Sequence, residues 1–424
     1  MLDQIMYKIF LYTGVFYLIH MGLYIAGANI HDILTFRNNA KKKKNPLKKI
    51  RPLVSVVIPA YNEELSIEKC LDSVRNSSYK RIEVIVHNDR STDNTRLILN
   101  EYKLKYPDFK LRIIRRRKQM GKAGGLNYCI KHYAKGSLIM TLDADCLLGK
   151  DSIKNAVTYF VDPYIVGVAA NVRILGKSSI LVLLQKFEHM IGYRSKKFYS
   201  LSNCEFIVGG VASTYRKQTL DKVGYYDTDT QTEDIGLSMK IVANGNKHER
   251  IVYAPDVVAS TGGVLTLGAL IKQRYRWKLG MLQNLIKYRG MAGNNDPQYS
   301  RTLTMYRIPV SFLSELLLII EPIMLAYVVY VSIIHDTFAL FIGAYLMVTL
   351  YVLWTVWPDE HSTNKQKFKL SLYAPFMYFI FYIMNLVQIV AIFQLILHPE
   401  KLFGKKMRAS HWVSPERSAD QFQT

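Results

Sequence analysis

The middle of the chain, from Leu53 to about Gly263, alternates short apolar runs with amphipathic stretches. Short apolar runs bounded by polar residues are typical of buried strands, and apolar residues every three or four positions are typical of helices. The expected strands are Val54–Pro59, Ile82–His87, Leu111–Ile114 and Ser137–Leu142, and the expected helices between them are Leu65–Arg75, Thr95–Leu104 and Gly124–Tyr133. Because this alternation is typical of parallel sheets, we predict an α/β fold with a doubly wound, mostly parallel sheet.

Long apolar stretches lie toward both ends of the chain. A membrane-spanning helix needs about 20 mostly apolar residues. Such stretches cover Ile9–Ile30 and, after Tyr306, Ile308–Ile334, Phe338–Trp357 and Leu370–Leu397. A cleaved signal peptide is the alternative for the first stretch, but the lysine run that follows it favours an uncleaved anchor with a cytosolic C-terminal flank. We therefore predict a multi-pass protein of the plasma (inner) membrane with its middle part in the cytosol.

The expected topology contains a conflict at the C-terminal end. Four crossings would leave both ends outside, yet the tail is basic and basic flanks prefer the cytosol. The basic residues of the tail are Lys401, Lys405, Lys406 and Arg408. We expect one apolar segment to be re-entrant or interfacial, and Ile308–Ile334 is favoured because it contains Glu315 and Glu321. A carboxylate inside a span usually faces a protein interior or a cavity; an interfacial position for Glu321 is equally compatible with the sequence.

Two further stretches, Ile180–Tyr199 and Leu265–Tyr288, mix apolar faces with Lys and Arg. They are compatible with helices in the membrane interface and also with ordinary surface helices. The expected organisation is an anchor and basic segment (1–50), a cytosolic domain (51–263), an interfacial helix (264–303), transmembrane helices (304–400) and a basic tail (401–424).

Composition narrows the classes of partner. The 424 residues carry a formal charge of +23, and half of them are hydrophobic. Much of the charge lies beside a predicted span, where basic residues attract anionic lipid, so a lipid membrane is favoured over nucleic acid as the partner. The four cysteines form no CxxC pair, so neither a disulfide framework nor a zinc site is expected.

Acidic side chains follow three of the predicted strands. Glu63 follows the first, Asp89 the second, and Asp143 and Asp145 the fourth. Because the carboxyl ends of strands in a doubly wound sheet meet at one crevice, these groups are expected to converge there. Clustered carboxylates repel one another unless a cation lies among them, and oxygen ligands suit Mg²⁺ or Mn²⁺. Taken alone, an Asp-x-Asp pair is also compatible with an ordinary turn.

Seven sequence strings change this picture when they are read together. They are VSVVIPAYNEE, VIVHNDRSTDNT, GKAGGLN, LDADC, VGGVASTYRK, TEDIGLSMKI and QRYRW, in this order between residues 53 and 277. In this the chain resembles the family 2 glycosyltransferases, specifically their processive membrane branch, which implies a GT-A fold. The tail string WVSPER is similar to that of bacterial poly-N-acetylglucosamine synthases, and hyaluronan and chitin synthases share much of the set.

The resemblance implies a role for each matching residue. Donor uracil and ribose would contact Ala60, Tyr61, Glu63 and Asp89, and Lys122 would approach the donor phosphates. Asp143 and Asp145 would bind the metal and the diphosphate, and Gly209 and Gly210 would shape the acceptor side. Asp234, beside Glu233, would be the general base, and Gln273, Arg276 and Trp277 match the motif of processive members. The chain departs from the family at Arg90, where a glycine is usual.

The expected activity is inverting, processive transfer from a UDP-sugar to a growing polysaccharide. The best-matching reaction is polymerisation of UDP-N-acetylglucosamine into poly-β-1,6-N-acetylglucosamine that enters the membrane. Hyaluronan or chitin synthesis is the alternative within the class. An inactive transporter or binding module is the alternative of another class. A separate small membrane subunit is left open.

Overall fold

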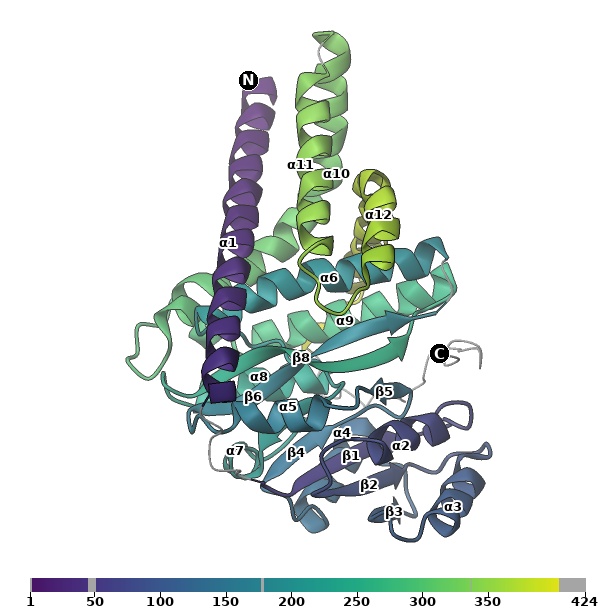
Figure 1. The fold of residues 1–424 in the computed structure, drawn as a ribbon. Coiled ribbons are helices and arrows are strands. Elements are labelled where there is room, and N and C mark those ends of the chain that lie inside the picture. Colours follow the sequence, from purple (N-terminus) through teal and green to yellow (C-terminus); the bar gives the residue numbers. More distant parts are fainter. Residues whose placement is uncertain (1, 45–50, 177–178, 337, 404–424) are drawn as a thin grey trace.

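The computed structural model describes residues 2–44, 51–176, 179–336 and 338–403 (Figure 1). The sheet domain occupies one end of the molecule in this view. Two long helices, α6 (Ile180–Leu201) and α9 (Leu267–Lys287), cross above it. Further helices extend away from the sheet domain on the other side of α6 and α9. The two amphipathic stretches of the sequence therefore lie between the sheet and the most apolar helices.

Eight strands form a single sheet. They are β1 (Val54–Ala60), β2 (Ile82–Asn88), β3 (Leu111–Arg115), β4 (Leu138–Thr141), β5 (Cys146–Leu148), β6 (Ile165–Leu175), β7 (Ser213–Arg216) and β8 (Arg250–Gly262), in the order β3-β2-β1-β4-β7-β6-β8-β5. The first four in this order pair in parallel, as do β6 and β8. Strand β7 is antiparallel to β4 and β6, and β5 is antiparallel to β8. The predicted mostly parallel sheet is confirmed, with a mixed half built after Asp145.

Helices cover both faces of the sheet because successive strand residues point to opposite sides. Val56 and Ile58 of β1 belong to the core on one face, and Val57 belongs to the core on the other. The first core includes residues of α2 (Ile67–Arg75), α3 (Thr95–Lys105) and α5 (Ser152–Tyr159). The second includes residues of α4 (Gly121–His132), α7 (Lys217–Val223) and α8 (Glu233–Asn244). This two-sided burial is the reason that the strands read as continuous apolar runs.

The N-terminal helix α1 (Leu2–Lys44) docks on α6 through a buried charge cluster. Asp32 lies 2.5 Å from Lys197 Nζ and 3.5 Å from Arg194 Nη1. Arg194 also donates to Asn29 Oδ1 at 2.7 Å. Because both cations are largely buried, the carboxylate of Asp32 offsets the cost of removing them from water.

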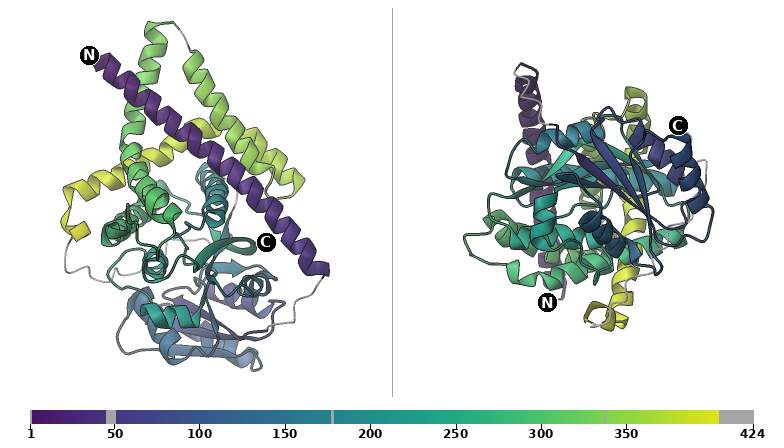
Figure 2. Two further views of the ribbon diagram at one scale, coloured as in Figure 1. Left: turned by 90° about the vertical axis from the view of Figure 1, so that its left-hand side faces the viewer. Right: turned by 90° about the horizontal axis from the view of Figure 1, so that it is seen from below.

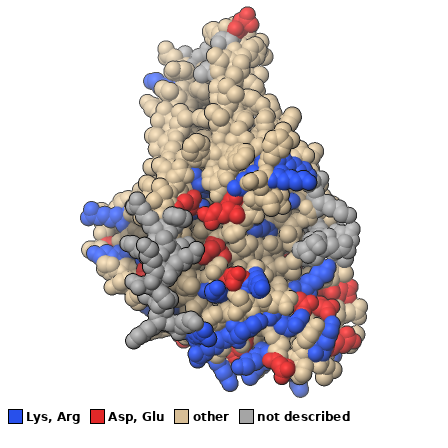
Figure 3. All heavy atoms as spheres, in the orientation of Figure 1, with Lys and Arg blue, Asp and Glu red and all other residues tan. Residues whose placement is uncertain are grey.

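Several described helices are suited to a membrane. Those long and apolar enough to cross one, judged by length and composition, are Gln4–Thr35, Thr302–Ile334 and Phe379–Leu397; Phe341–Val356 is shorter. The remaining C-terminal elements are η1 (Arg289–Met291), the π-helix η2 (Thr302–Arg307), α10 (Ile308–Ile334), α11 (Ala339–Val356), α12 (Asn364–Leu397) and α13 (Glu400–Phe403). Charged side chains gather over the lower part of the face in Figure 3, whereas the upper helices show few charged side chains there.

The orientation of α12 differs from the sequence expectation. Helices α10 and α11 lead away from the domain and back toward it, and they splay apart in Figure 2, whereas α12 runs across the direction of α11, beside α9 (Figures 1 and 2). The helix with the divergent direction is therefore α12, whereas the sequence favoured Ile308–Ile334 as the re-entrant or interfacial segment. The predicted basic tail lies outside the described residues from position 404 onward, as do residues 45–50 of the basic segment after α1.

Glu321, in the middle of α10, faces other helices. Tyr17 of α1 and Asn385 of α12 both donate hydrogen bonds to its carboxylate. Of the two positions that the sequence left open for this side chain, the structure shows the interior one. The carboxylate thus ties three helices of the apolar part together.

Candidate active site

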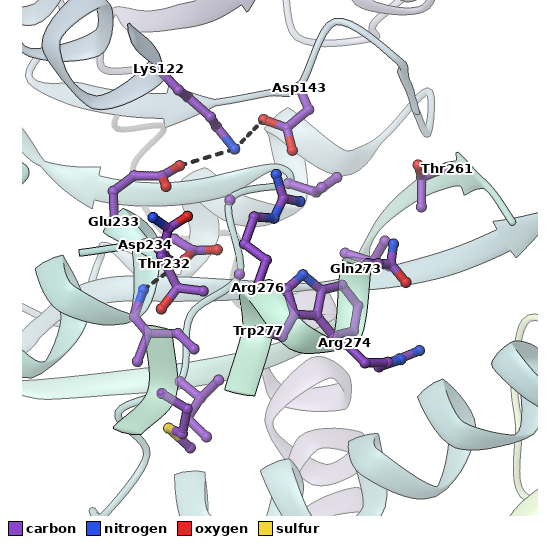
Figure 4. A pocket seen from close by; sticks show the side chains of 18 of the residues that line it. Lys122, Asp143, Thr232, Glu233, Asp234, Thr261, Gln273, Arg274, Arg276 and Trp277 are labelled. Atoms are coloured by element: carbon purple, nitrogen blue, oxygen red, sulfur yellow. Dashed lines mark hydrogen bonds and ion pairs between the residues drawn. The ribbon is translucent and has the colours of Figure 1, made fainter. Parts of the chain in front are cut away.

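A pocket of about 520 Å³ lies between the sheet domain, α6 and α9. It brings together predicted residues from the start of α4, from the segments after β4 and before β7, from the start of α8 and from α9. They are Lys122, Asp143, Asp145, Gly209, Gly210, Glu233, Asp234, Gln273, Arg276 and Trp277. Residues far apart in the sequence thus face one cavity, and Figure 4 shows most of the charged ones converging on it.

The predicted nucleotide-binding residues lie at the carboxyl ends of β1 and β2, beside this pocket rather than in its wall. Ala60 and Asp89 end neighbouring strands, and the Asp89 amide donates to the Ala60 carbonyl at 2.9 Å. The Asp89 carboxylate accepts from the Met120 and Gly121 amides at 2.8 and 2.9 Å, at the start of α4. A helix N-terminus favours a carboxylate, so the chain itself fixes this side chain.

The other two predicted nucleotide-binding residues are arranged differently. The buried Glu63 accepts from the Ser66 hydroxyl at 2.7 Å, and its amide donates to the Thr95 hydroxyl at 2.8 Å. Tyr61 is partly exposed beside it.

Arg90 adopts the backbone conformation that the usual glycine would favour. Its φ is +65°, in the left-handed region. A residue with a Cβ pays about 1–2 kcal/mol there. The neighbouring Asn62 has a φ of +56°, and its side chain accepts from the Thr92 amide at 2.8 Å. The loop therefore keeps its left-handed geometry in spite of Arg90, whose side chain is exposed.

Lys122 links two acidic residues across the pocket. Its Nζ lies 2.8 Å from Asp143 Oδ1 and 3.1 Å from Glu233 Oε1 (Figure 4). Burial lowers the pKa of the Lys122 ammonium, but the charges of Asp143 and Glu233 outweigh burial and hold that pKa well above its usual value. This lysine is therefore a fixed positive charge between the residues after β4 and the start of α8.

The residues after β4 suit a divalent cation. The ligand atoms of Asp143, Asp145 and Cys146 all lie within 4.8 Å of one another. The carboxylates are the hard oxygen ligands that Mg²⁺ and Mn²⁺ prefer, whereas the Cys146 thiol donates to Asp145 Oδ1 at 3.1 Å. The donor set therefore fits the predicted metal.

Gly210 leaves open the space between the side chains of Lys122, Asp143 and Asp234. A Cβ built on it would lie 3.0 Å from Lys122 Nζ and 3.6 Å from Asp234 Oδ2. Any larger side chain would therefore enter the space in front of the acidic residues. Gly209, in contrast, has nothing within 4 Å of a built Cβ.

Asp234 lies in the first turn of α8. Burial, followed by the charge of Glu233, raises the pKa of its carboxyl to about 6, while the charge of Lys122 opposes the rise. Its Oδ1 accepts from the Ile235 amide at 2.9 Å, which leaves Oδ2 toward Gly210. A carboxylate with a pKa close to neutrality is well suited to accept a proton from a substrate hydroxyl.

Helix α9 supplies the opposite wall. Arg276 and Trp277 extend from it into the pocket, and Gln273 lies one turn before them (Figure 4). The guanidinium of Arg274 stacks 4.2 Å from the Trp277 ring centre and pairs with Glu188 of α6 at 2.7 Å. This stacking and ion pair hold the indole ring in place.

The pocket continues toward the apolar helices, and the residues that line this part of it were not among the predicted site residues. Lys278 Nζ pairs with both carboxylate oxygens of Glu315 in α10, at 2.8 and 2.7 Å. Gln388 of α12 also lines the pocket, as does His189 of α6, whose Nδ1 lies 3.2 Å from the Val172 carbonyl oxygen of β6. The position of Glu315 in a predicted span was the one signal in the sequence; no pattern indicated the others.

The mixed sheet, with carboxylates at the carboxyl ends of its parallel strands, has the GT-A arrangement. Residues 55–224 match the model of glycosyl transferase family 2, so this part of the chain is similar to that family.

The chain is similar to the poly-beta-1,6-N-acetyl-D-glucosamine synthases of Staphylococcus aureus and Staphylococcus epidermidis. It is 33% identical over 277 residues to the first, covering 64% of this chain and 65% of the relative. It is 35% identical over 237 residues to the second, covering 55% and 56%. The matched part thus spans just under two thirds of the length of the first relative and a little over half of the length of the second.

Among solved structures, a mannosyltransferase from Pyrobaculum calidifontis, in complex with GDP-Man and Mn²⁺, has a similar fold. Its TM-score is 0.54 at 20% identity, and the match covers 91% of this chain and all of that one.

Proposed function

We propose that this protein is an inverting, processive membrane glycosyltransferase that polymerises UDP-N-acetylglucosamine into poly-β-1,6-N-acetylglucosamine and passes the polymer into the membrane. One observation carries the proposal: a single pocket joins the acidic residues after β4 and at α8 to α9, and continues to Glu315 and Gln388 on the apolar helices. The sugar and linkage are inferred from the names of the similar synthases.

The proposed reaction is a single displacement. The acceptor hydroxyl oxygen attacks the anomeric carbon of the donor, and the bond from that carbon to the diphosphate breaks, so UDP leaves with the bonding electrons. Asp234 takes the hydroxyl proton as attack proceeds, because a hydroxyl alone is a weak nucleophile. One displacement on an α-linked donor produces a β-linkage.

Charge on the leaving diphosphate must be stabilised as it develops. Lys122 and Arg276 are cations of the chain that face this space, and a guanidinium matches phosphate oxygens bidentately. Asp143 and Asp145 would hold Mg²⁺ or Mn²⁺, which, when bound, neutralises diphosphate charge. Ala60, Tyr61, Glu63 and Asp89 would hold the uridine at the carboxyl ends of β1 and β2.

The acceptor would bind in the part of the pocket that lies nearer to the apolar helices. Trp277 offers a flat apolar face on which a sugar ring packs, and its ring is held by Arg274. Beyond it, Lys278, Glu315 and Gln388 offer hydrogen-bonding groups toward the apolar helices. A growing chain anchored at Trp277 would therefore leave toward the membrane.

The arrangement of the helices supports a topology that removes the conflict over the basic tail. With α1, α10 and α11 crossing and α12 lying at the cytosolic interface, the catalytic domain and the C-terminal end both fall in the cytosol. The lysines that end α1 then lie on the side that basic flanks prefer, and the same topology suits a basic C-terminal tail.

The proposal is tested with purified protein in lipid nanodiscs, UDP-N-acetylglucosamine and Mg²⁺ or Mn²⁺. We expect a polymer together with one UDP released per sugar, and a loss of both in Asp234→Asn, which keeps the shape but not the basicity. Full incorporation by Asp234→Asn would overturn the role of the base. An obligatory requirement for UDP-glucuronate would favour hyaluronan synthesis, and a 4-linked product would favour chitin synthesis. Absence of metal-dependent UDP release would favour an inactive binding module.

A further inference from the structure

One face of α9 forms hydrogen bonds with the loop of residues 227–232, which leads into Glu233 and Asp234. Gln283 Oε1 accepts from the Gln231 amide at 3.0 Å. Asn284, which is fully buried, donates from Nδ2 to the Thr232 carbonyl at 3.2 Å. These contacts reach the residue directly before the acidic pair.

The end of α9 holds the beginning of the same loop. Lys287 Nζ lies 2.8 Å from Asp227 Oδ2 and 2.9 Å from Asp229 Oδ2. Tyr288 also donates to Asp227, at 3.3 Å. The loop is thus fixed to α9 at both ends.

At Gly280 the backbone of α9 packs closely against Thr232, which makes the contact between α9 and the loop rigid. A Cβ at this position would lie 2.3 Å from Thr232 Oγ1, 2.6 Å from its Cγ2 and 2.7 Å from its backbone nitrogen. Such distances are far inside van der Waals contact, and one of the atoms belongs to the backbone. Gly268, on the same helix, has nothing within 4 Å of a built Cβ.

Thr232 transmits these contacts to α8. Its carbonyl accepts the first helical hydrogen bond of α8, from the Gly236 amide at 3.0 Å, and also accepts from Asn284. A Cβ on Gly236 would lie 3.0 Å from Asn284 Oδ1, so the two helices nearly touch there. The start of α8, and with it Asp234, is therefore set by α9.

We infer that Gly280 and Asn284 are positioning residues that hold the base Asp234 in register with the residues of α9 that face the substrates. This inference rests on the proposed function. Because Gln273, Arg276 and Trp277 lie on the same helix, a movement of α9 carries the substrate-facing side chains and the base together. A misplacement of about 1 Å costs about 100-fold in rate at a reacting centre.

The test compares Gly280→Ala and Asn284→Asp with the matched control Gly268→Ala. Asn284→Asp keeps the side-chain shape but turns an oxygen, in place of the donating amide, toward the carbonyl oxygens of Thr232 and Gly280. The proteins are purified in the same nanodiscs, and kcat is expressed per UDP-binding site, so that unfolded protein does not count.

We expect Gly280→Ala and Asn284→Asp to lower kcat by about 10- to 100-fold, while the KM for the donor and the Kd for UDP stay within about twofold. Gly268→Ala should behave as the wild type. Adding Thr232→Ser to Gly280→Ala removes one of the clashing atoms and should recover part of the lost kcat. An unchanged kcat in both test variants, or a parallel loss of kcat and UDP binding in both, would overturn the inference.

Hydrogen exchange of the amides from Thr232 to Gly236 provides a readout that does not need turnover. Both test variants should exchange faster there than Gly268→Ala, and equal exchange would count against the inference. If the wild type consumes a UDP-sugar other than UDP-N-acetylglucosamine, the proposed substrate fails, and the same comparison is made with that sugar.

Discussion

Replacing Lys122 by methionine removes a cation that pairs with both Asp143 and Glu233. The contacts of 2.8 and 3.1 Å correspond to a gross attraction of about 5–6 kcal/mol each at an effective dielectric of about 20. Desolvation of the ammonium offsets much of this, and deleting one partner of a buried pair costs about 3–5 kcal/mol. Because the side chain is 17% exposed to the pocket, we expect a loss of about 2–3 kcal/mol in the free energy of unfolding.

The pKa of Lys122 is raised, so its contribution is complete below the usual lysine pKa and is lost only as the pH rises through the higher folded value. The loss in Lys122→Met should therefore not diminish as the pH rises from about 6 to 9. Thermal unfolding in detergent, with and without Mn²⁺, measures it.

The control is Lys118→Met, an exposed lysine nearby, which should change stability by less than about 0.5 kcal/mol. Mn²⁺ should raise the Tm of Lys122→Met more than that of the wild type, because it relieves the same repulsion between carboxylates. Equal losses for Lys122→Met and Lys118→Met, or no selective effect of Mn²⁺, would refute this reasoning.

Three further predictions concern other residues. The folded pKa of Asp234, about 6, exceeds the usual 3.8, so its stabilising contribution is present at low pH and lost above about pH 6. Asp234→Asn should then raise the free energy of unfolding at pH 8 by about 1–2 kcal/mol, after allowance for the open side of the pocket, and should not raise it at pH 4; thermal unfolding measures both, and an equal rise at both pH values contradicts this. Arg90→Gly should leave stability unchanged or raise it by up to about 1 kcal/mol in chemical unfolding, whereas Arg90→Ala should not; a loss of more than 1 kcal/mol in Arg90→Gly argues against strain. Asp32→Asn leaves the cations Lys197 and Arg194 unpaired and should lower stability by about 2–4 kcal/mol, measured by thermal unfolding, with an additional Lys197→Met restoring part of it; a loss that the second change deepens would count against the charge cluster.

The fold was predictable from the sequence where local pattern and burial agree. Strands β1, β2 and β4 are almost continuous apolar runs because helices cover both faces, and the parallel order of β1 to β4 follows from the helices between them. The mixed half was not predicted, because β7 is a short strand whose place between β4 and β6 depends on contacts distant in sequence.

The orientation of α12 also depends on tertiary contacts. Hydropathy measures length and apolarity, which make Phe379–Leu397 of α12 a candidate span, but it does not give the direction of the helix. Its packing beside α9 and the bond from Asn385 to Glu321 are visible only in the folded chain.

Motifs located the residues that follow strands, but not those that position them. Asp143 and Asp234 stand in recognisable strings, whereas Asn284 and Glu315 carry no pattern of their own. The role of Asn284 arises from the approach of α9 to α8, and that of Glu315 from Lys278 on the facing helix. Arg90 illustrates the reverse case: the departure from glycine was visible in the sequence, and the left-handed φ shows its backbone consequence.

The central claim is tested most directly by the product that the purified protein makes from a mixture of UDP-N-acetylglucosamine, UDP-glucuronate and UDP-glucose with Mg²⁺ and Mn²⁺. Product length is read by gel filtration, and linkage by methylation analysis. The proposed function predicts a long polymer of 6-linked N-acetylglucosamine only, absent in Asp234→Asn. A 4-linked or mixed-sugar polymer, or a single sugar added to lipid, would contradict it.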